Sequence, residues 1–124
     1  MSMPTPTLAL SDSFLKAYDR LPSPQKKKVR SFIEKFQTTP TAHAIDYEKL
    51  NDMADDRVRT VRIDQAWRAI IVHPDKGNVH LLVWVAHHDD AHDWARNRRF
   101  DIHPETGQIQ IYRVLSDEPR PGEA

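Results

Sequence analysis

The sequence predicts an α+β fold in which an antiparallel, mainly meander β-sheet carries two helices from the N-terminal part on one face and a short helix near the C-terminus. Two observations predict it. The apolar residues of positions 11–38 recur with the period of a helix, whereas those of positions 57–86 form short runs rich in Val, Ile and Trp. Turn-forming residues separate these runs, which is typical of strands that pair with their neighbours in sequence.

A short strand over 7–10 and two helices are expected in the first third of the chain. Ser11 or Asp12 can cap the first helix, which places Phe14, Tyr18 and Leu21 on one face. The second helix has apolar residues spaced i, i+3, i+4 and i+7, at Val29, Phe32, Ile33 and Phe36. Its lysines lie mainly off this stripe. We interpret them as a solvated face, with a nucleic-acid contact as the alternative.

Three strands are expected next, over 57–63, 66–73 and 78–86. The third is apolar at both odd and even positions, so we expect both of its faces to be buried and the strand to be central. A helix over 89–98 and two short strands, 100–102 and 109–114, around a turn at 105–107 complete the order. The whole forms a single domain over 1–115, followed by a polar, proline-containing tail or linker over 116–124.

Composition excludes several classes of protein. The 18 basic and 18 acidic residues give zero net charge, which argues against nucleic-acid binding by overall charge but leaves local basic groups possible. The absence of cysteine excludes disulfides and thiolate zinc sites. No run approaches the ~20 apolar residues of a membrane helix, so no membrane partner is expected. The first ten residues lack the features of a signal peptide, which makes a cytoplasmic location the default expectation.

The stretch VWVAHHDDAHDWARNRR, residues 83–99, is the main candidate for a functional site. His88 and His92 share a helix face and Asp89 or Asp93 could add a third metal ligand. The stretch lacks the glutamate of the H-E-x-x-H motif and a second ligand motif, so we expect no metal and no cofactor. The remaining interpretations are an RNA site and a solvated helix whose acidic first turn suits the helix dipole.

Two segments carry a resemblance to a known family. YEKLNDMADDRVRTVRIDQAWRAIIVHP, residues 47–74, resembles the strand hairpin of the RelE/ParE superfamily of toxin-antitoxin systems, and LLVWVAHHDDAHDWA, residues 81–95, resembles its following strand and helix. The match covers roughly residues 7–99. The HHDDA-x-x-WA ending followed by IHPETGQIQ is similar to RelE-like domains at the N-terminus of some UvrD-like helicases, and the tail over 116–124 fits such a linked arrangement.

The resemblance implies an RNA-binding role for arginines of the hairpin. Cleavage by 2′-OH attack needs a general base, a general acid and cations that stabilise the developing phosphorane charge. Arg68 matches the most recurrent arginine of the family and Arg59 another basic position, while Arg57 and Arg62 are further candidates. A two-residue turn at 64–65 would place Arg59 and Arg68 on one face, whereas a three-residue turn would pair Arg62 with Arg68. For each arginine, a surface ion pair with a nearby aspartate is the alternative.

The same resemblance nominates residues around the strand end. His87 and His88 fall where the family has a basic pair, and histidine can act as acid or base near neutral pH. Trp94 falls where the ribosome-dependent members have a catalytic tyrosine. A tryptophan cannot transfer a proton there, but it can stack on a base. We expect the central strand to end at His87 and His88, with His88 facing the same concave surface as Arg68.

These residues define two hypotheses. The first is a RelE-like endoribonuclease toxin domain that acts on RNA or ribosome-bound mRNA and pairs with an antitoxin; its candidate catalytic residues are Arg68, His87, His88 and His92, and its candidate RNA contacts are Arg57, Arg59, Arg62, Arg68 and Trp94. The second is a non-catalytic module of the same fold, associated with a helicase or an antitoxin. A gyrase poison of the ParE kind has no sequence feature specific to it.

Overall fold

The computed structural model describes residues 7–38, 48–75, 77, 79–102 and 109–113. The expected turn at 105–107 and the tail over 116–124 lie outside these ranges. The elements, in chain order, are β1 (Thr7–Leu10), α1 (Asp12–Asp19), α2 (Ser23–Thr38), β2 (Glu48–Lys49), β3 (Val58–Arg62), β4 (Trp67–Val72), β5 (Val79–His87), α3 (His88–Arg96), β6 (Arg98–Ile102) and β7 (Ile109–Arg113). No helix of the described part is long and apolar enough to span a membrane.

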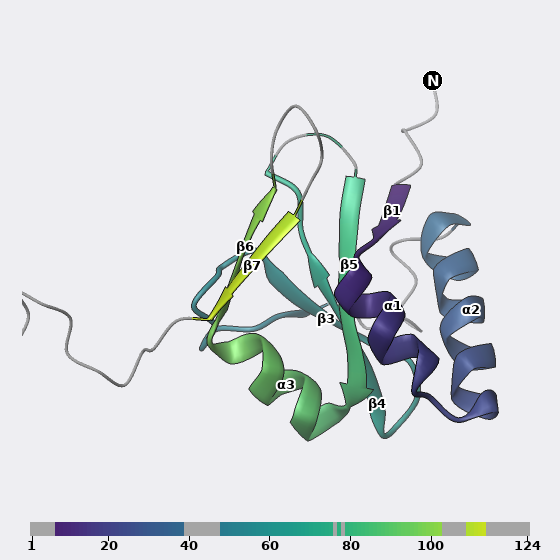
Figure 1. Cartoon of the computed structure of the whole chain (residues 1–124). Helices are drawn as coiled ribbons and strands as arrows, with labels where there is room; N and C mark the ends of the chain where they lie inside the picture. The colour runs from purple at the N-terminus through teal and green to yellow at the C-terminus, as the bar shows by residue number, and fades with distance from the viewer. Residues whose placement is uncertain (1–6, 39–47, 76, 78, 103–108, 114–124) are drawn as a thin grey trace, which may run out of the picture.

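A five-stranded sheet in the order β1-β5-β4-β3-β2 forms the centre of the molecule (Figure 1). The expected meander is present, because β2, β3, β4 and β5 pair antiparallel in sequence order. The central position of β5 is confirmed, since β1 lies on its other side. That last pair is parallel, with Thr7 opposite Val79, so the sheet is mixed. The strands β6 and β7 form a separate antiparallel pair.

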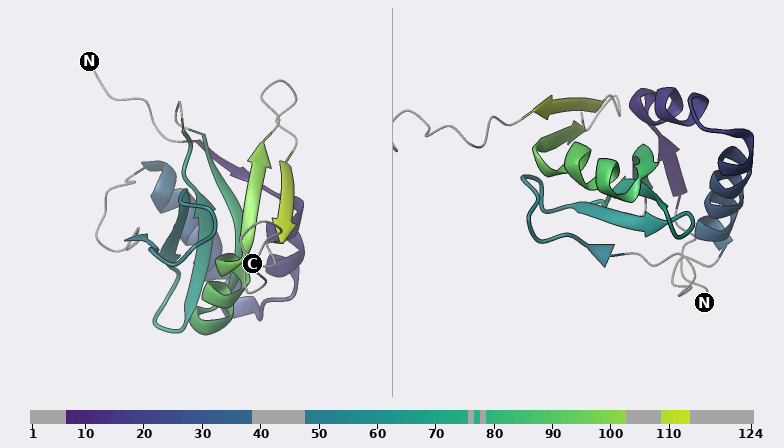
Figure 2. Two further views of the ribbon diagram at one scale, coloured as in Figure 1. Left: turned by 90° about the vertical axis from the view of Figure 1, so that its left-hand side faces the viewer. Right: turned by 90° about the horizontal axis from the view of Figure 1, so that it is seen from below.

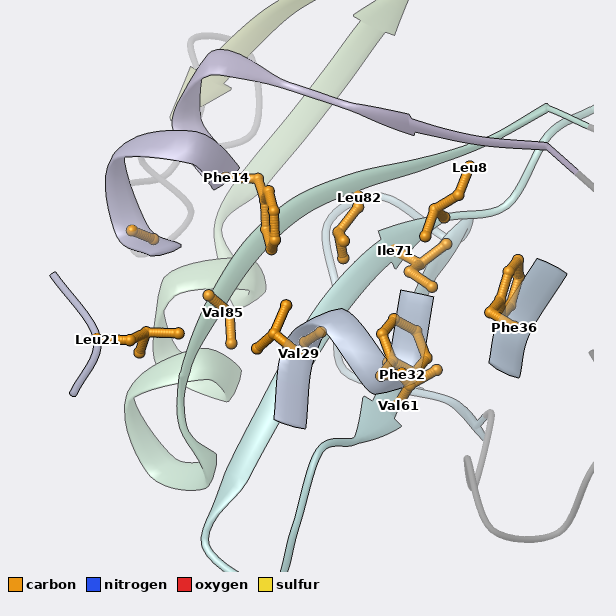
Figure 3. Close-up of a cluster of buried hydrophobic side chains, with 12 residues drawn as sticks. Leu8, Phe14, Leu21, Val29, Phe32, Phe36, Val61, Ile71, Leu82 and Val85 are labelled. Carbon is orange, nitrogen blue, oxygen red and sulfur yellow. The ribbon is translucent and has the colours of Figure 1, made fainter. Parts of the chain in front are cut away.

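The helices α1 and α2 cover one face of the sheet, as expected (Figure 1). Ser11 caps α1 by accepting a hydrogen bond from the Phe14 N–H at 3.1 Å, and the Ser13 hydroxyl donates to the Val83 carbonyl of β5 at 2.7 Å. The core on this face joins both helices to β1, β3, β4 and β5 (Figure 3), through Leu8, Phe14, Leu21, Val29, Phe32, Phe36, Val61, Ile71, Leu82 and Val85.

The opposite face of the sheet is covered by α3 and the β6–β7 pair (Figures 1 and 2). Its core consists of Val58, Ile70, Val72, Val83, Ala91, Ala95 and Phe100. The pairing of β4 with β5 contains a β-bulge. Ile70 pairs with Trp84 and Ile71 with Leu82, which leaves Val83 as an extra residue in β5. Leu82 and Val85 therefore face the same side, although simple alternation along the strand would separate them.

The helix α3 is shorter than expected. It begins at His88, one residue earlier than the sequence indicated, and ends at Arg96. The expected last residue, Arg98, belongs to β6 instead, where it pairs with Arg113 of β7. Pairing with β7 satisfies the backbone groups of Arg98 in a strand, so the helix stops before it.

Candidate nucleic-acid site between β4 and α3

A hollow of about 630 Å³ lies beside α3, on the sheet face that α3 covers. Residues of β2, the position after it, β3, β4 and α3 line it: Glu48, Leu50, Thr60, Arg68, His88, Asp89, His92, Asp93 and Arg96. The helix contributes His88, His92 and Arg96 because residues four apart lie on the same side of an α-helix. The hollow thus brings together three of the predicted site residues, Arg68, His88 and His92.

His88 lies at the junction of β5 and α3, as expected. Its backbone N–H donates to the Ala66 carbonyl at 2.7 Å, which anchors the start of the helix to the turn between β3 and β4. Its Nδ1 lies 2.8 Å from the Asp89 carboxylate. Because Nδ1 lies against this carboxylate, Nε2 is the ring nitrogen that remains to exchange a proton with a ligand. The side chain is 45% exposed and therefore accessible to a ligand.

His92 has a carboxylate partner of its own. Its Nε2 lies 3.0 Å from Oδ2 of Asp52, in the segment before β3. The hydrogen bond with His92 is the main reason that the pKa of Asp52 lies below its ordinary value. Arg96 also reaches Asp52, at 3.5 Å, and Asp93, at 3.6 Å. The face of α3 that borders the hollow is therefore a network of surface ion pairs.

Arg68 is held in place by the turn that precedes β4. Its Nη1 donates to the carbonyls of Asp64 at 2.6 Å, Gln65 at 3.2 Å and Trp67 at 3.0 Å. These bonds fix one end of the guanidinium. Within the described part of the chain, no hydrogen bond is made by its Nε or Nη2, which leaves the other edge of the group to bind a carboxylate or phosphate.

The register of the hairpin decides between the two arrangements expected for the arginines. Arg62 pairs directly with Arg68, and the Ile63 N–H donates to the Trp67 carbonyl at 3.0 Å, so the turn comprises residues 64–66. The three-residue alternative is the one observed. Arg59 pairs with Ile71, which faces α1 and α2, so Arg59 lies on the opposite side of the sheet from Arg68. The side chain of Arg62 lines a different hollow, against α2.

Arg57 forms a structural ion pair. The Asp55 carboxylate is buried and accepts hydrogen bonds from Arg57 Nη2 at 2.9 Å, from the Arg57 N–H at 3.0 Å and from the Phe100 N–H at 3.1 Å. Burial alone would raise the pKa of Asp55, but these hydrogen bonds outweigh it and hold the pKa below its ordinary value. Arg57 also donates to the Phe100 carbonyl. The pair thus ties the segment before β3 to β6, and the guanidinium that we expected to contact RNA is engaged there.

Trp94 and His87 do not line the hollow. The Trp94 ring stacks on Trp84, with centroids 4.5 Å apart and an interplanar angle of 2°, and the Arg98 guanidinium lies 4.5 Å from its centroid. These contacts occupy the ring that we expected to stack on a base. His87 is exposed and contacts Trp67 and His88, with ring centroids 6.1 and 4.5 Å away. Its side chain sits at the rim of the junction.

Several residues that line the hollow were not predicted from the sequence as site residues. Arg96 carried a usable signal, because it continues the spacing of four from His88 and His92. Glu48 carried none, because the two-residue strand β2 is too short to produce a pattern. The hollow as a whole contains two arginines and three carboxylates. It is therefore not a basic site, a property that only the assembled fold reveals.

One group of side chains has the spacing of metal ligands. Ligating atoms of His87, His88 and Asp89 lie within 4.8 Å of one another, and all three residues are exposed. It is the one such group of three among the residues that the structure describes. His92, which the sequence suggested as a partner of His88, is not part of this group, and its Nε2 lies beside Asp52.

Comparison with known proteins gives a clear result for the fold. Neither protein-family models nor curated protein sequences provide a match. Solved structures do. RelE in the RelE–RelB complex of the archaeon Pyrococcus horikoshii matches at a TM-score of 0.54 and 20% identity, over 67% of this chain and 94% of that one. A mutant of the Escherichia coli toxin RelE matches at 0.55 and 16%, over 74% and 93%.

A third structure, a YoeB/ParE toxin from Agrobacterium tumefaciens, matches at a TM-score of 0.53 and 18% identity, over 66% of this chain and 98% of that one. The chain has a RelE/ParE-like toxin fold. The two segments whose sequence resembled this superfamily, 47–74 and 81–95, contain β2, β3, β4 and most of β5 and α3. Of these elements, β2, β3, β4 and α3 border the hollow.

Proposed function

We propose that this chain is a RelE-like, toxin-type domain that binds RNA in the hollow between β4 and α3 and cleaves it without a metal ion or cofactor. One observation carries the proposal: a cation with a free edge, Arg68, and two accessible histidines, His88 and His92, line the same hollow. These are the residue types that RNA cleavage by 2′-OH attack requires.

The contacts of each residue suggest its role. His88, held by Asp89 through Nδ1, takes the proton of the 2′-OH on Nε2 while the 2′-oxygen attacks the phosphorus. Arg68 stabilises the charge on the phosphorane oxygens. His92, oriented by Asp52, gives a proton to the departing 5′-oxygen. The bond from phosphorus to the 5′-oxygen breaks, and the products are a 2′,3′-cyclic phosphate and a 5′-hydroxyl.

The partner and the substrate follow by analogy. RelE of Pyrococcus horikoshii was solved with RelB, and the Escherichia coli toxin YafQ was solved with DinJ. We therefore propose that a small antitoxin protein binds this chain and that its substrate is RNA or ribosome-bound mRNA in the cytoplasm.

Expression in a bacterial host tests the proposal. We expect growth arrest and cleavage of mRNA when the chain is produced, and relief of both by Arg68→Ala and by His88→Ala. Asp90→Ala and Arg20→Ala are matched controls, since both residues are exposed and neither lines the hollow. Normal growth with intact mRNA, at a confirmed level of folded protein, would contradict the proposal.

A second candidate is a non-catalytic module of the same fold that binds a partner, such as a linked helicase region or an antitoxin. Two observations favour it. Trp94, which stands where related toxins have a catalytic tyrosine, is packed against Trp84, and the carboxylates of the hollow outnumber its arginines. This candidate predicts that RNA stays intact while a partner protein binds the chain, and that His88→Ala changes neither result.

A further inference from the structure

The helix α2 concentrates basic charge in a protein that has none overall. The chain contains equal numbers of basic and acidic residues. Within α2, one acid, Glu34, stands against five basic residues: Lys26, Lys27, Lys28, Arg30 and Lys35. This excess of basic residues on one helix marks a distinct surface, because acidic residues elsewhere in the chain balance its charge.

The lysines near the start of α2, unlike Lys35 in its last turn, are not placed where a cation favours helix stability. Lys26, Lys27 and Lys28 lie within the first two turns, and the first turn contains no acid. The N-terminal end of a helix is the positive end of its dipole, where acidic residues are favourable and lysines are not. Solvation of the helix would be served equally well by glutamates there. Neither the helix dipole nor solvation therefore requires this positive charge, which can attract a negatively charged ligand.

These cations line a hollow. A second depression, of about 430 Å³, lies between α2 and the end of β3. Its lining consists of Lys27, Lys28, Ser31, Phe32, Lys35, Arg62, Ile63 and Asp64. Four cations thus face one carboxylate, which Lys28 pairs at 3.0 Å. The side-chain ammonium groups of Lys27 and Lys35 form no ion pair or hydrogen bond within the described part of the chain, so both remain available to a ligand.

The turn between β3 and β4 connects this hollow with the proposed cleavage site. Asp64 binds Lys28 of α2, and the Ala66 carbonyl accepts the His88 N–H of α3. Arg62 and Arg68 are directly paired across the hairpin, and each lines one of the two hollows. The two depressions therefore flank the same three-residue turn, which makes a single extended ligand able to occupy both.

The two hollows differ in charge, and only one of them can attract a polyanion strongly. The proposed cleavage site has more carboxylates than arginines, so it contributes little attraction for a polyanion. The α2 hollow has an excess of cations. Phosphate contacts supply most of the affinity of a protein for nucleic acid and are independent of sequence.

We propose that the α2 hollow, through Lys27, Lys28, Lys35 and Arg62, binds the phosphate backbone of the same single-stranded RNA whose cleavage is proposed at His88. The inference rests on the proposed function for its ligand. The hollow acts as a positioning site: it holds the strand on one side of the turn, and the strand continues past Arg68 into the other depression.

Salt-dependent binding of an uncleavable RNA tests the inference. The probe is a 2′-O-methyl oligouridylate of about ten nucleotides, a length within the usual range of single-strand sites. We compare the native chain with Lys27→Gln/Lys35→Gln and with the control Lys16→Gln/Arg20→Gln, in α1 and at its C-cap, whose residues are also exposed. Loss of two phosphate contacts should reduce the slope of log affinity against log salt by about 1.4, which corresponds to roughly 25-fold weaker binding at 0.1 M salt.

Each outcome decides the question. A lower slope in the α2 variant alone supports the inference. An unchanged slope, or equal losses in the variant and the control, overturns it. Binding of polyglutamate in preference to the oligonucleotide also overturns it, because the hollow would then serve an acidic protein. The probe cannot be cleaved, so failure of RNA binding at α2 is distinguishable from failure of cleavage, which is measured separately with unmodified RNA and His88→Ala.

Discussion

The two sides of α3 have opposite roles in the molecule. On one side, His88, His92 and Arg96 border an open hollow and make ion pairs at the surface. On the other, Ala91 and Ala95 are completely buried against the sheet. Nine residues thus supply both a solvent-facing row of titratable groups and part of a hydrophobic core. The position of a residue on the helix, more than its type, therefore decides which side chains of α3 are accessible to a substrate.

Trp94 is the clearest example of a residue whose position on α3 decides its role. The sequence resemblance to RelE/ParE toxins places Trp94 where those toxins have a catalytic tyrosine, yet its ring stacks on Trp84 and contacts Phe100 in the core of that face. His88, in contrast, is nearly half exposed and its ion pair with Asp89 is a surface pair, of small value for stability. Substitutions on the open side should therefore change activity, and substitutions on the packed side should change stability.

The largest effect is expected on the open side. His88→Ala removes the proposed general base, so the rate of RNA cleavage should fall by about 1000-fold, while the free energy of unfolding should change by less than about 0.5 kcal/mol. Cleavage assays on purified protein and urea unfolding check the two values. Asp90→Ala serves as the control. An unchanged cleavage rate in His88→Ala would contradict the catalytic role proposed for the open side of α3.

The second effect belongs to the packed side. Trp94→Ala removes the stack on Trp84 and leaves a cavity, so the free energy of unfolding should fall by about 3 kcal/mol. Trp94→Tyr should cost less than about 1.5 kcal/mol and should not increase cleavage, because the ring still points into the core. Urea unfolding and the cleavage assay measure both variants. A strong gain of activity in Trp94→Tyr would show that this position does reach the substrate.

The third effect concerns the buried carboxylate of Asp55, which binds Arg57 and the backbone of Phe100 on the packed side. Asp55→Asn removes the buried charged partner of Arg57, which keeps only the longer, exposed contact with Asp75 at 3.5 Å, and should lower stability by about 2 kcal/mol at pH 7. The pKa of Asp55 lies below its ordinary value of 3.8 in the folded state, so its contribution is present above that pH and is lost as the pH falls further. The difference between native chain and variant should therefore shrink below about pH 4. Unfolding curves from pH 7 to pH 3 measure it, and a difference independent of pH would argue against the ion pair.

The smallest effect is expected for Asp52→Asn. Asp52 is exposed and orients His92 from outside the helix. Stability should change by less than about 0.5 kcal/mol, because exposed ion pairs contribute little. Cleavage should fall by roughly 10-fold or less, since His92 keeps its place on α3 and loses only an orienting contact. A loss as large as that of His88→Ala would mean that Asp52 itself takes part in the reaction.

The sequence predicted the parts of the fold that depend on local periodicity. The apolar stripe of α2 and the runs of β3, β4 and β5 repeat often enough to reveal both element type and buried face. It did not predict β2, which has two residues, or the parallel pairing of β1, which depends on where α1 returns the chain. The bulge at Val83 was also invisible, because nothing in the alternation of β5 signals an extra residue.

The candidate site was predicted only where it depends on local geometry. The spacing of four placed His88 and His92 together, and the turn at the end of β5 placed His88 near Arg68. The partition of the arginines depended on the hairpin register, which a change of one residue in the turn would reverse. The engagement of Arg57 by Asp55 and Phe100 depended on a contact between segments more than 40 residues apart.

The ends of the RNA products provide the most direct test of the central claim. Purified chain is incubated with free RNA in the presence of a chelator of divalent ions and, in a separate reaction without the chelator, with mRNA on translating ribosomes, and the product ends are identified by mass spectrometry. The account predicts a 2′,3′-cyclic phosphate on one fragment and a 5′-hydroxyl on the other, both absent with Arg68→Ala and with His88→Ala. Intact RNA from the folded native chain, or fragments that end in a 3′-hydroxyl and a 5′-phosphate, would contradict it.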